Sequence, residues 1–467
     1  MSRLGLAARV RRIHFVGIGG IGMSGIARVL LELGHTVSGS DRREGPGLDG
    51  LREAGALVRV GHEPEAVEGA DVVVVSSAIP LDNPEVVAAR QDGIPVIPRA
   101  EMLAELMRSQ AGIAVAGSHG KTTTTSLIGS VLAHAGLDPT IVVGGALRRW
   151  GTGHRGAGDL MVAEADESDG SFLLLAPTIS VVTNIDPEHL EHYGGSTSKL
   201  EAAFSRFLGK TPFYGRVVAC IDDPGVGRVL DTLDRPRFTY GLDARADFSL
   251  RVGTVERSGQ SIRVRGPDGE HAFWLPMLGI HNALNATAAV AVGHDLGLEP
   301  ERVAEGLAAF EGVDRRFTIR GVVGEVEVVD DYGHHPTEIV ATLQGVREAR
   351  PRQRILVGFQ PHRFSRTRDF LGAFARAFDG ADMVVVAPVY AAGEAPMAGA
   401  TADDLVEAMR RHGHPSCRLA SNCEQMSAYL IEKSEPGDLI LLLGAGDISD
   451  QSPRILGSLG SHDGREA

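Results

Sequence analysis

Short apolar runs rich in Val, Ile and Leu alternate with longer amphipathic or alanine-rich stretches through most of the chain. Runs such as residues 72–75 and 439–443 have the length of buried strands, and the stretches between the runs have the length of helices. This alternation is the βαβ pattern of a parallel sheet that is covered by helices on both faces. The sequence therefore predicts an α/β fold.

The chain has 467 residues, which is too long for one ordinary core, so we expect several domains. The first two domains start near the apolar runs at 13–17 and 113–116. The second domain ends near the charged joint Asp314-Arg315-Arg316. The predicted domains are residues 1–108, 109–314 and 315–467. Strands in the third domain are expected at 326–329, 355–359, 383–387 and 439–443.

Composition narrows the class of protein. Hydrophobic residues at 43% and charged residues at 23% are typical of a globular chain, and no apolar stretch nears the roughly 18 residues of a membrane span. A net charge of -14 argues against a general nucleic-acid binder but leaves small anionic ligands open. The three cysteines (Cys220, Cys417 and Cys423) form no CxxC pair, which suits a reducing cytoplasm.

A first glycine loop follows the strand expected at 13–16. Residues 17–22 fit G-x-G-x-x-G and open a helix expected to run through residue 31, and Asp41 ends the next strand, where an acid could bind a ribose hydroxyl. Taken alone, the loop indicates an NAD-dependent oxidoreductase; a close helix–strand crossing without ligand is the plainer alternative. The strand–loop–helix context favours a nucleotide or nucleotide-sugar, and glycines alone do not say which.

A second loop, Gly117-Ser118-His119-Gly120-Lys121-Thr122, lies between a strand expected at 113–116 and a helix expected at 121–134. Backbone N–H groups at such a junction attract phosphate. Lys121 would place its charge at the terminal phosphates, and the Thr122 hydroxyl could bind Mg²⁺. The loop is not a full Walker motif, because Val115 stands at the first glycine position, and a chance GKT is common. The strand and helix around it favour the ATP site.

Acidic residues follow the strand expected at 160–163. The run 164–169 holds four acids at the carboxyl end of that strand, where carboxylates suit a hard cation; a solvated acidic turn is the alternative. A further strand, expected at 179–183, is followed by His189. That histidine could contact metal or phosphate, although a histidine after a turn is often a surface residue.

These motifs resemble those of the Mur ligases of peptidoglycan synthesis, over nearly the whole chain. The matching segments are the second loop, EADESDGSF at 164–172, TNIDPEHLEHY at 183–193, LGIHNALNA at 278–286, RRF at 315–317, DDYGHHPTEI at 330–339 and FQPHRFSRTRD at 359–369. Within the family, GIGGIGMSGIA at 17–27 and VYAAGE at 389–394 are typical of the member that adds L-alanine to UDP-N-acetylmuramate.

The resemblance implies an ATP-dependent ligase that joins L-alanine to the carboxylate of UDP-N-acetylmuramate through an acyl phosphate and releases ADP and phosphate. It implies a Rossmann-like first domain that binds the UDP-sugar, a P-loop ATPase-like central domain that binds ATP and Mg²⁺, and a Rossmann-like third domain that closes and brings the amino acid. Nucleic-acid and membrane partners are not expected, the location would be the cytoplasm, and a monomer or a dimer remains open.

The resemblance also assigns residues. ATP would be bound by Gly117, Ser118, His119, Gly120, Lys121, Thr122, Thr123, Asn282 and Asp331. The metal would be bound by Thr122, Glu164 and His189. The UDP-sugar would be bound by Gly17, Gly19, Gly20, Gly22, Ser40, Asp41 and Ser76. The amino acid would be bound by Tyr332, Arg363 and Arg366. Catalysis would depend on Lys121, His189, Arg316 and His334.

Chemistry supports some of these roles. The carboxylate of alanine needs a planar two-pronged donor, which Arg363 or Arg366 could supply, and Arg316 could neutralise the acyl phosphate. His334 is a candidate base for the attacking amine because its ordinary pKa lies near working pH. Later-acting relatives usually carry a carbamylated lysine after the His189 motif; Phe204 stands there, so no carbamate is expected.

Plainer alternatives remain for several of these residues and for the activity. Residues 334–336 could form a turn before a helix that starts at Pro336, Asn282 could cap a helix, and Arg366 with Arg368 could be solvated charges at a helix start. The rival activities are a Mur ligase that attaches a recycled tripeptide, an NAD-dependent oxidoreductase, and an ATP-binding switch without catalysis.

Overall fold

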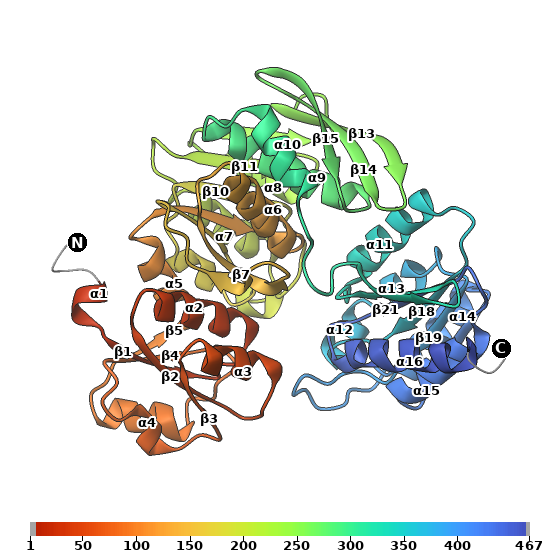
Figure 1. Cartoon of the computed structure of the whole chain (residues 1–467), viewed down its shortest axis with the longest axis horizontal. Helices are drawn as coiled ribbons and strands as arrows, with labels where there is room; N and C mark the ends of the chain where they lie inside the picture. The colour runs from red at the N-terminus through yellow and green to blue at the C-terminus, as the bar shows by residue number, and fades with distance from the viewer. Residues whose placement is uncertain (1–5, 464–467) are drawn as a thin grey trace. The chain divides into compact units, whose positions relative to one another are not determined.

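A computed structural model describes residues 6–463. Their strands form three sheets, one after another along the chain (Figure 1). The chain folds into two compact units. The first unit holds the first two sheets, apart from a short hairpin tip, and the second holds the third sheet. The second unit consists of Val255–Gly259, Met277–His281 and the chain from Gly312 onwards.

The first sheet has the order β3-β2-β1-β4-β5, and its registered pairs are parallel. Its strands are β1 Arg12–Val16, β2 Thr36–Asp41, β3 Leu57–Val60, β4 Val72–Val75 and β5 Val96–Pro98. Its helices are α1 Leu6–Arg9, α2 Ile21–Glu32, α3 Pro46–Glu53, α4 Pro84–Gln91 and α5 Arg99–Met107. Alternate side chains of β1 and β4 face opposite ways: Phe15 and Val74 pack with α2 and α5, and Val16 and Val73 pack with α4.

The second sheet has ten strands in the order β15-β14-β13-β12-β11-β10-β6-β9-β7-β8. These are β6 Ala111–Ala116, β7 Thr140–Leu147, β8 Gly151–His154, β9 Leu160–Glu164, β10 Ile179–Val182, β11 Arg216–Cys220, β12 Arg237–Gly241, β13 Phe248–Glu256, β14 Gly259–Gly266 and β15 Gly269–Leu275. Its helices are α6 Lys121–His134, α7 Thr197–Leu208, α8 Pro224–Leu230, α9 Ile280–Asp295 and α10 Pro300–Ala308. Strands β9, β6 and β10 are parallel neighbours, so their carboxyl ends meet at one edge of the sheet.

The third sheet has the order β16-β17-β21-β18-β19-β20, in which only β16 runs antiparallel to its neighbour among the registered pairs of the described chain. Its strands are β16 Thr318–Val323, β17 Val326–Asp331, β18 Ile355–Phe359, β19 Met383–Val386, β20 Cys417–Leu419 and β21 Leu439–Leu443. Its helices are α11 Pro336–Ala349, α12 Phe364–Asp369, α13 Leu371–Ala377, α14 Ala402–His412, α15 Cys423–Lys433 and α16 Gln451–Asp463.

The core of the third sheet explains why its strands are continuous apolar runs in the sequence. Leu441 and Leu443 of β21 pack with one set of helices, and Ile440 and Leu442 pack with α15 and α16 on the other face. A strand that is buried on both faces shows no polar alternation. The predicted α/β fold, with a separate sheet in each of three successive parts of the chain, is therefore confirmed.

Among residues 6–463, we find no helix with both the length and the hydropathy that a membrane crossing requires.

Candidate active site

The second glycine loop joins β6 to α6, as the sequence predicted. Gly117 and Gly120 have φ of +138° and +79°, a region of backbone conformation that favours glycine. A Cβ on Gly117 would overlap the Thr183 hydroxyl, and a Cβ on Gly120 would lie 2.6 Å from Oδ1 of Asn285. Both glycines are therefore required by backbone conformation and by close neighbours, independently of any ligand.

The segment after β10 supports this loop from one side. Asn184 Oδ1 accepts the backbone N–H of His119 at 2.8 Å, and the Thr183 hydroxyl donates to the carbonyl of His119 at 2.6 Å. The Ser118 hydroxyl accepts the backbone N–H of Asp186 at 2.9 Å. These bonds fix the loop conformation before any phosphate binds, which lowers the entropy lost on binding.

Lys121 is the first residue of α6, and its ammonium group turns back over the loop. Nζ donates to the carbonyl of Gly117 at 2.6 Å and to the carboxylate of Glu167 at 2.9 and 3.0 Å. Burial opposes the charge on Lys121, but the carboxylates of Glu167 and Asp166 outweigh burial and raise the pKa of Lys121. Lys121 therefore carries its positive charge at neutral pH.

Thr122 and Glu164 lie together next to Lys121. The Thr122 hydroxyl hydrogen-bonds the Glu164 carboxylate, and Glu164 Oε1 accepts the backbone N–H of Gly144 at 2.8 Å. Burial raises the pKa of Glu164. A hydroxyl and nearby carboxylates are the oxygen ligands that a hard divalent cation requires, so the donor set fits Mg²⁺. Thr123, also predicted at the ATP site, is buried in the first turn of α6.

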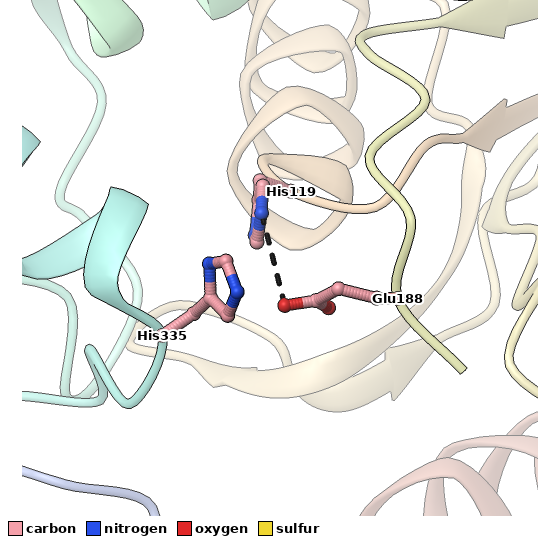
Figure 2. A group of neighbouring side chains, drawn as sticks. All are labelled: His119, Glu188 and His335. Atoms are coloured by element: carbon pink, nitrogen blue, oxygen red, sulfur yellow. Dashed lines mark ion pairs between the residues drawn. The ribbon is translucent and has the colours of Figure 1, made fainter. Parts of the chain in front are cut away.

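The histidines of this region have acidic neighbours. His119 Nε2 lies 3.0 Å from Asp186 Oδ2 and 3.9 Å from Glu188 Oε1, and Figure 2 shows the latter pair. His189 adopts a φ of +54°. Its Nε2 lies 3.9 Å from Glu188 Oε2, and its Nδ1 lies 3.8 Å from Glu191 Oε1. Glu188 thus lies within ion-pair distance of both histidines, and it is 9% exposed.

Asn282 lies inside α9, so the alternative that it caps a helix is wrong. The helix begins at Ile280, directly after Gly279 with a φ of +88°. Asn285, one turn further along, donates to Asn282 Oδ1 at 3.5 Å and lies against Gly120. Asn285 therefore reaches the phosphate loop, and its i+3 spacing from Asn282 was the available sequence signal.

The first glycine loop is held by the end of β2. The backbone N–H groups of Gly17 and Ile18 donate to the carbonyl of Ser40 at 2.8 and 3.0 Å, and Gly17 has a φ of +81°. Asp41 Oδ2 accepts the N–H of Gly19 at 2.9 Å. The backbone N–H of Gly20 donates to the Gly17 carbonyl at 3.2 Å. Asp41, expected near a ribose, thus also fixes the loop itself.

The side chain of Ser40 is fully buried. Its hydroxyl donates to Glu85 Oε2 at 2.5 Å and accepts from His62 Nδ1 at 2.9 Å. His62 is 22 positions and Glu85 is 45 positions from Ser40 in the chain, so the sequence did not single out either residue. Ser76, after β4, accepts the backbone N–H of Ala78 at 3.1 Å.

The second unit gathers the residues predicted near 316 and 331–334. Arg316 Nη1 lies 3.4 Å from Glu338 Oε1, and its guanidinium lies 5.4 Å from the ring centre of Tyr332. Asp331 accepts the backbone N–H groups of Phe317 and Gly333, both at 2.7 Å. Burial raises the pKa of Asp331 to about 6.

The arginines after β18 lie in the same unit. Arg363 has a φ of +70° and precedes α12. Arg366, the third residue of α12, is half-buried, and its Nη1 donates to His362 Nδ1 at 3.4 Å, whereas Arg368 is exposed. The Ser365 hydroxyl donates to Glu394 at 2.6 Å, so two sequence motifs, 359–369 and 389–394, are joined.

Comparison with known proteins places this arrangement in one family. Sequence models of the "Mur ligase family, catalytic domain", the "Mur ligase middle domain" and the "Mur ligase, glutamate ligase domain" match residues 12–111, 115–293 and 315–446. The chain belongs to the Mur ligase family. Enzymes of this family are ATP-dependent ligases.

Individual Mur ligases are similar over nearly the full length. The UDP-N-acetylmuramate–L-alanine ligase of Anaeromyxobacter dehalogenans (strain 2CP-C) is 52% identical over 97% of this chain and 98% of its own. That of Myxococcus xanthus is 50% identical over 95% and 94%. The crystal structure of the UDP-N-acetylmuramate–alanine ligase of Thermotoga maritima is 31% identical, with a TM-score of 0.84 over 97% of this chain and 99% of that one.

The position at which later-acting Mur ligases usually carry the lysine is apolar here. Phe204 in α7 is fully buried, and its ring centre lies 5.2 Å from that of Phe172. This side chain is therefore part of the apolar core of the first unit.

His334 differs from the sequence prediction in its acid–base state. Nδ1 donates to the carbonyl of Tyr332 at 3.0 Å, so the lone pair of the neutral ring is on Nε2. Burial lowers the pKa of His334 to about 3, with the charge of Arg366 acting in the same direction and Glu338 opposing. The reason given for its role as a base, an ordinary pKa near working pH, is therefore wrong.

This depressed pKa predicts an acid-dependent loss of stability. Between pH 6.5 and about 3 the unfolded chain binds a proton at His334 that the folded chain does not, so stability falls as pH falls. His281 and His362, with pKa values lowered to about 4 by burial, act in the same direction, and Asp331 acts oppositely. From pH 7 to pH 4, a His334→Gln variant should lose less unfolding free energy than the wild type, by roughly 3 kcal/mol. Urea titrations at pH 7 and pH 4 measure the loss of unfolding free energy for each protein. An equal loss in the variant and the wild type would contradict the assignment.

Proposed function

We propose that this Mur ligase joins L-alanine to the carboxylate of UDP-N-acetylmuramate with ATP, releasing ADP and phosphate. The observation that carries the proposal is the similarity, over nearly the whole chain, to enzymes named UDP-N-acetylmuramate–L-alanine ligase. The second glycine loop, with a charged lysine and neighbouring carboxylates, supports an ATP-dependent activation step.

The chemistry requires that the carboxylate be activated. A carboxylate anion resists attack by an amine in neutral water, so the γ-phosphoryl group of ATP is first transferred to one of its oxygens. The amine of alanine then attacks the carbonyl carbon, and phosphate leaves with the C–O bonding electrons. Phosphoryl transfer of this kind depends on positioning and on neutralising negative charge. Lys121 would bring the positive charge to the γ-phosphate.

Mg²⁺ is proposed at Thr122 and Glu164, with His189 at a second metal or its water. The hydroxyl and the carboxylate are already within hydrogen-bond contact of each other. The cation, when bound, would neutralise phosphate charge.

The second unit is proposed to bring the amino acid. A guanidinium of Arg363 or Arg366 would bind the alanine carboxylate, and Arg316 would stabilise the acyl phosphate. Tyr332 lies beside Arg316 and would line the same pocket. His334, neutral at pH 7, could accept a proton from the amine only at Nε2, and its low pKa makes it a weak base.

The division into residues 1–108, 109–314 and 315–467 is proposed with these roles. The UDP-sugar is proposed to lie at Gly17, Gly19, Gly20 and Gly22 with Ser40, Asp41 and Ser76. Adenosine is proposed to contact Asn282 and Asp331. A cytoplasmic location, where ATP and nucleotide-sugars are made, is part of the proposal.

The test is release of phosphate from ATP in the presence of UDP-N-acetylmuramate and a panel of acceptors. L-Alanine should give the highest kcat/KM, and glycine and L-serine should keep part of the turnover because their side chains differ from a methyl group by very little. The tripeptide L-alanyl-γ-D-glutamyl-meso-diaminopimelate is the competing acceptor. Turnover with that tripeptide and none with L-alanine would refute the proposal.

A further inference from the structure

Arg99 lies between the two glycine loops of the first unit. It is the first residue of α5 and directly follows β5. Its guanidinium packs on Gly22 in the first turn of α2: a Cβ on Gly22 would overlap Nη1 and lie 3.1 Å from Cζ. On its other side, Nη2 donates to Asp166 Oδ2 at 3.3 Å. One side chain therefore touches the first glycine loop and the acidic segment after β9.

Asp166 connects Arg99 to the ATP loop. It lies two residues after Glu164 and interacts with the charge of Lys121 as well as that of Arg99. Its Oδ1 accepts the backbone N–H of Ser168 at 3.1 Å, which fixes the carboxylate in place. Arg99, Asp166 and Lys121 thus form a row of alternating charges that leads from the start of α2 to the start of α6.

The contacts of Arg99 leave it able to bind a further anion. A guanidinium has five N–H donors, and the ion pair with Asp166 uses Nη2. The side chain is 26% exposed, so a ligand can reach it. Its planar fork matches the oxygen atoms of a carboxylate or a phosphate. The neighbouring N-terminus of α2 adds backbone N–H groups that attract the same kind of group.

We propose that Arg99 binds an oxyanion of the nucleotide-sugar, either its pyrophosphate or the carboxylate on its sugar, and directs the reacting end toward Lys121. This inference rests on the proposed function. The reaction requires one ligand to extend from the first glycine loop to the γ-phosphate beside Lys121, and Arg99 touches residues of both places. The Asp166 carboxylate holds the guanidinium in position before the substrate arrives.

A purely structural ion pair between α5 and the segment after β9 is the competing explanation. A partly exposed pair of this kind contributes about 1 kcal/mol or less to stability. Its loss would lower the melting temperature slightly and would leave the KM of the nucleotide-sugar unchanged. The two explanations therefore differ in a measurement that does not depend on folding.

The experiment compares Arg99→Ala and Arg99→Lys with Arg108→Ala in the full-length enzyme. Arg108 caps the other end of α5, and its side chain is 75% exposed. Arg99→Ala should raise the KM of UDP-N-acetylmuramate by roughly 10- to 100-fold, the loss expected for a hydrogen bond between charged groups, and leave the KM of ATP within about twofold. Arg99→Lys should recover part of the loss, and Arg108→Ala should behave as wild type.

Gly22→Ala provides a second variant that keeps the charge. The added methyl group must push the guanidinium away from α2, so the KM of the nucleotide-sugar should rise here as well. Gly22 itself belongs to the proposed nucleotide-sugar site, so Gly22→Ala supports the role of Arg99 only together with the Arg99 variants. If Arg99→Ala does not fold, Arg99→Lys decides the question by the same measurement.

Inhibition by UDP-N-acetylglucosamine separates the two oxyanions, because it has the pyrophosphate but lacks the carboxylate. If Arg99 binds the pyrophosphate, Arg99→Ala should weaken this inhibition as strongly as it raises the substrate KM. If Arg99 binds the carboxylate, only the substrate should be affected. A wild-type enzyme that turns over, with an unchanged substrate KM in Arg99→Ala, would overturn the role of Arg99 and leave the proposed function standing.

Discussion

A Lys121→Ala variant should lose roughly 1,000-fold or more in kcat for ATP-dependent phosphate release. The ammonium group lies over the loop between β6 and α6, 2.6 Å from the Gly117 carbonyl, where a γ-phosphate is proposed to bind. Removing one preorganised donor from a developing charge typically costs about 100- to 1,000-fold, and Lys121 also contributes a full positive charge. Steady-state kinetics at saturating ATP measures the loss, and a kcat within about tenfold of wild type would refute the assigned role.

This result must be separated from a loss of folding. Glu167 is 2% exposed and pairs with Lys121, so Lys121→Ala leaves a buried carboxyl group without its cation. The double variant Lys121→Ala/Glu167→Gln removes that unpaired acid. It should recover thermal stability and remain inactive. Lys199→Ala, which changes an exposed lysine in α7, is the matched control and should keep wild-type kinetics.

A Gly117→Ala variant should be both less stable and less active. Gly117 has a φ of +138°, and the new methyl group would overlap the Thr183 hydroxyl and lie 3.1 Å from the backbone of Asn184. Backbone cannot move aside as a flexible side chain can, so the loop itself must shift. We expect a loss of roughly 3 kcal/mol or more in unfolding free energy, since strain of about 1–3 kcal/mol adds to the clash. The KM of ATP should rise by at least about tenfold.

Gly136→Ala distinguishes strain from clash. Gly136 follows α6 in the same unit and has a φ of +80°, but no heavy atom lies within 4 Å of an added Cβ. It should lose only about 1 kcal/mol and keep the wild-type KM for ATP. Urea unfolding and ATP titrations of the two variants provide the comparison. Equal effects at both positions would show that the packing around Gly117 is unimportant.

Much of the fold could be predicted because local patterns and burial agree. Helix α6 and strands β18 and β21 have the predicted bounds, since a glycine precedes the helix and each strand is one uninterrupted apolar run. One alternative that the sequence left open, a helix cap at Asn282, was wrong because the helix start was ambiguous. Asn282 is a favourable cap residue, but the helix already begins at Ile280.

The partners of the predicted site residues could not be read from the sequence. Glu167 is 46 positions from Lys121, and Asp166 is 67 positions from Arg99. Lys121 and Glu167 meet because β6 and β9 are parallel neighbours whose carboxyl ends lie at one edge of the second sheet. Arg99 follows β5 of the first sheet and Asp166 follows β9 of the second, so that pair joins two sheets. Glu85 and His62 were missed because their bonds to Ser40 join residues far apart in the chain. Asn285 was missed although its i+3 spacing from Asn282 was available.

The sequence by itself determined the three α/β domains, the two strand–loop–helix junctions and membership of the Mur ligase family, because these depend on periodicity, glycines and motif spacing along the chain. The tertiary structure alone decided the state of the groups at the site. Lys121 is charged because two carboxylates that are far from it in the sequence outweigh the effect of its burial. The Ser40 hydroxyl donates to Glu85, and His334 is neutral with a pKa near 3. Desolvation and charge act through space, so only the folded arrangement sets them.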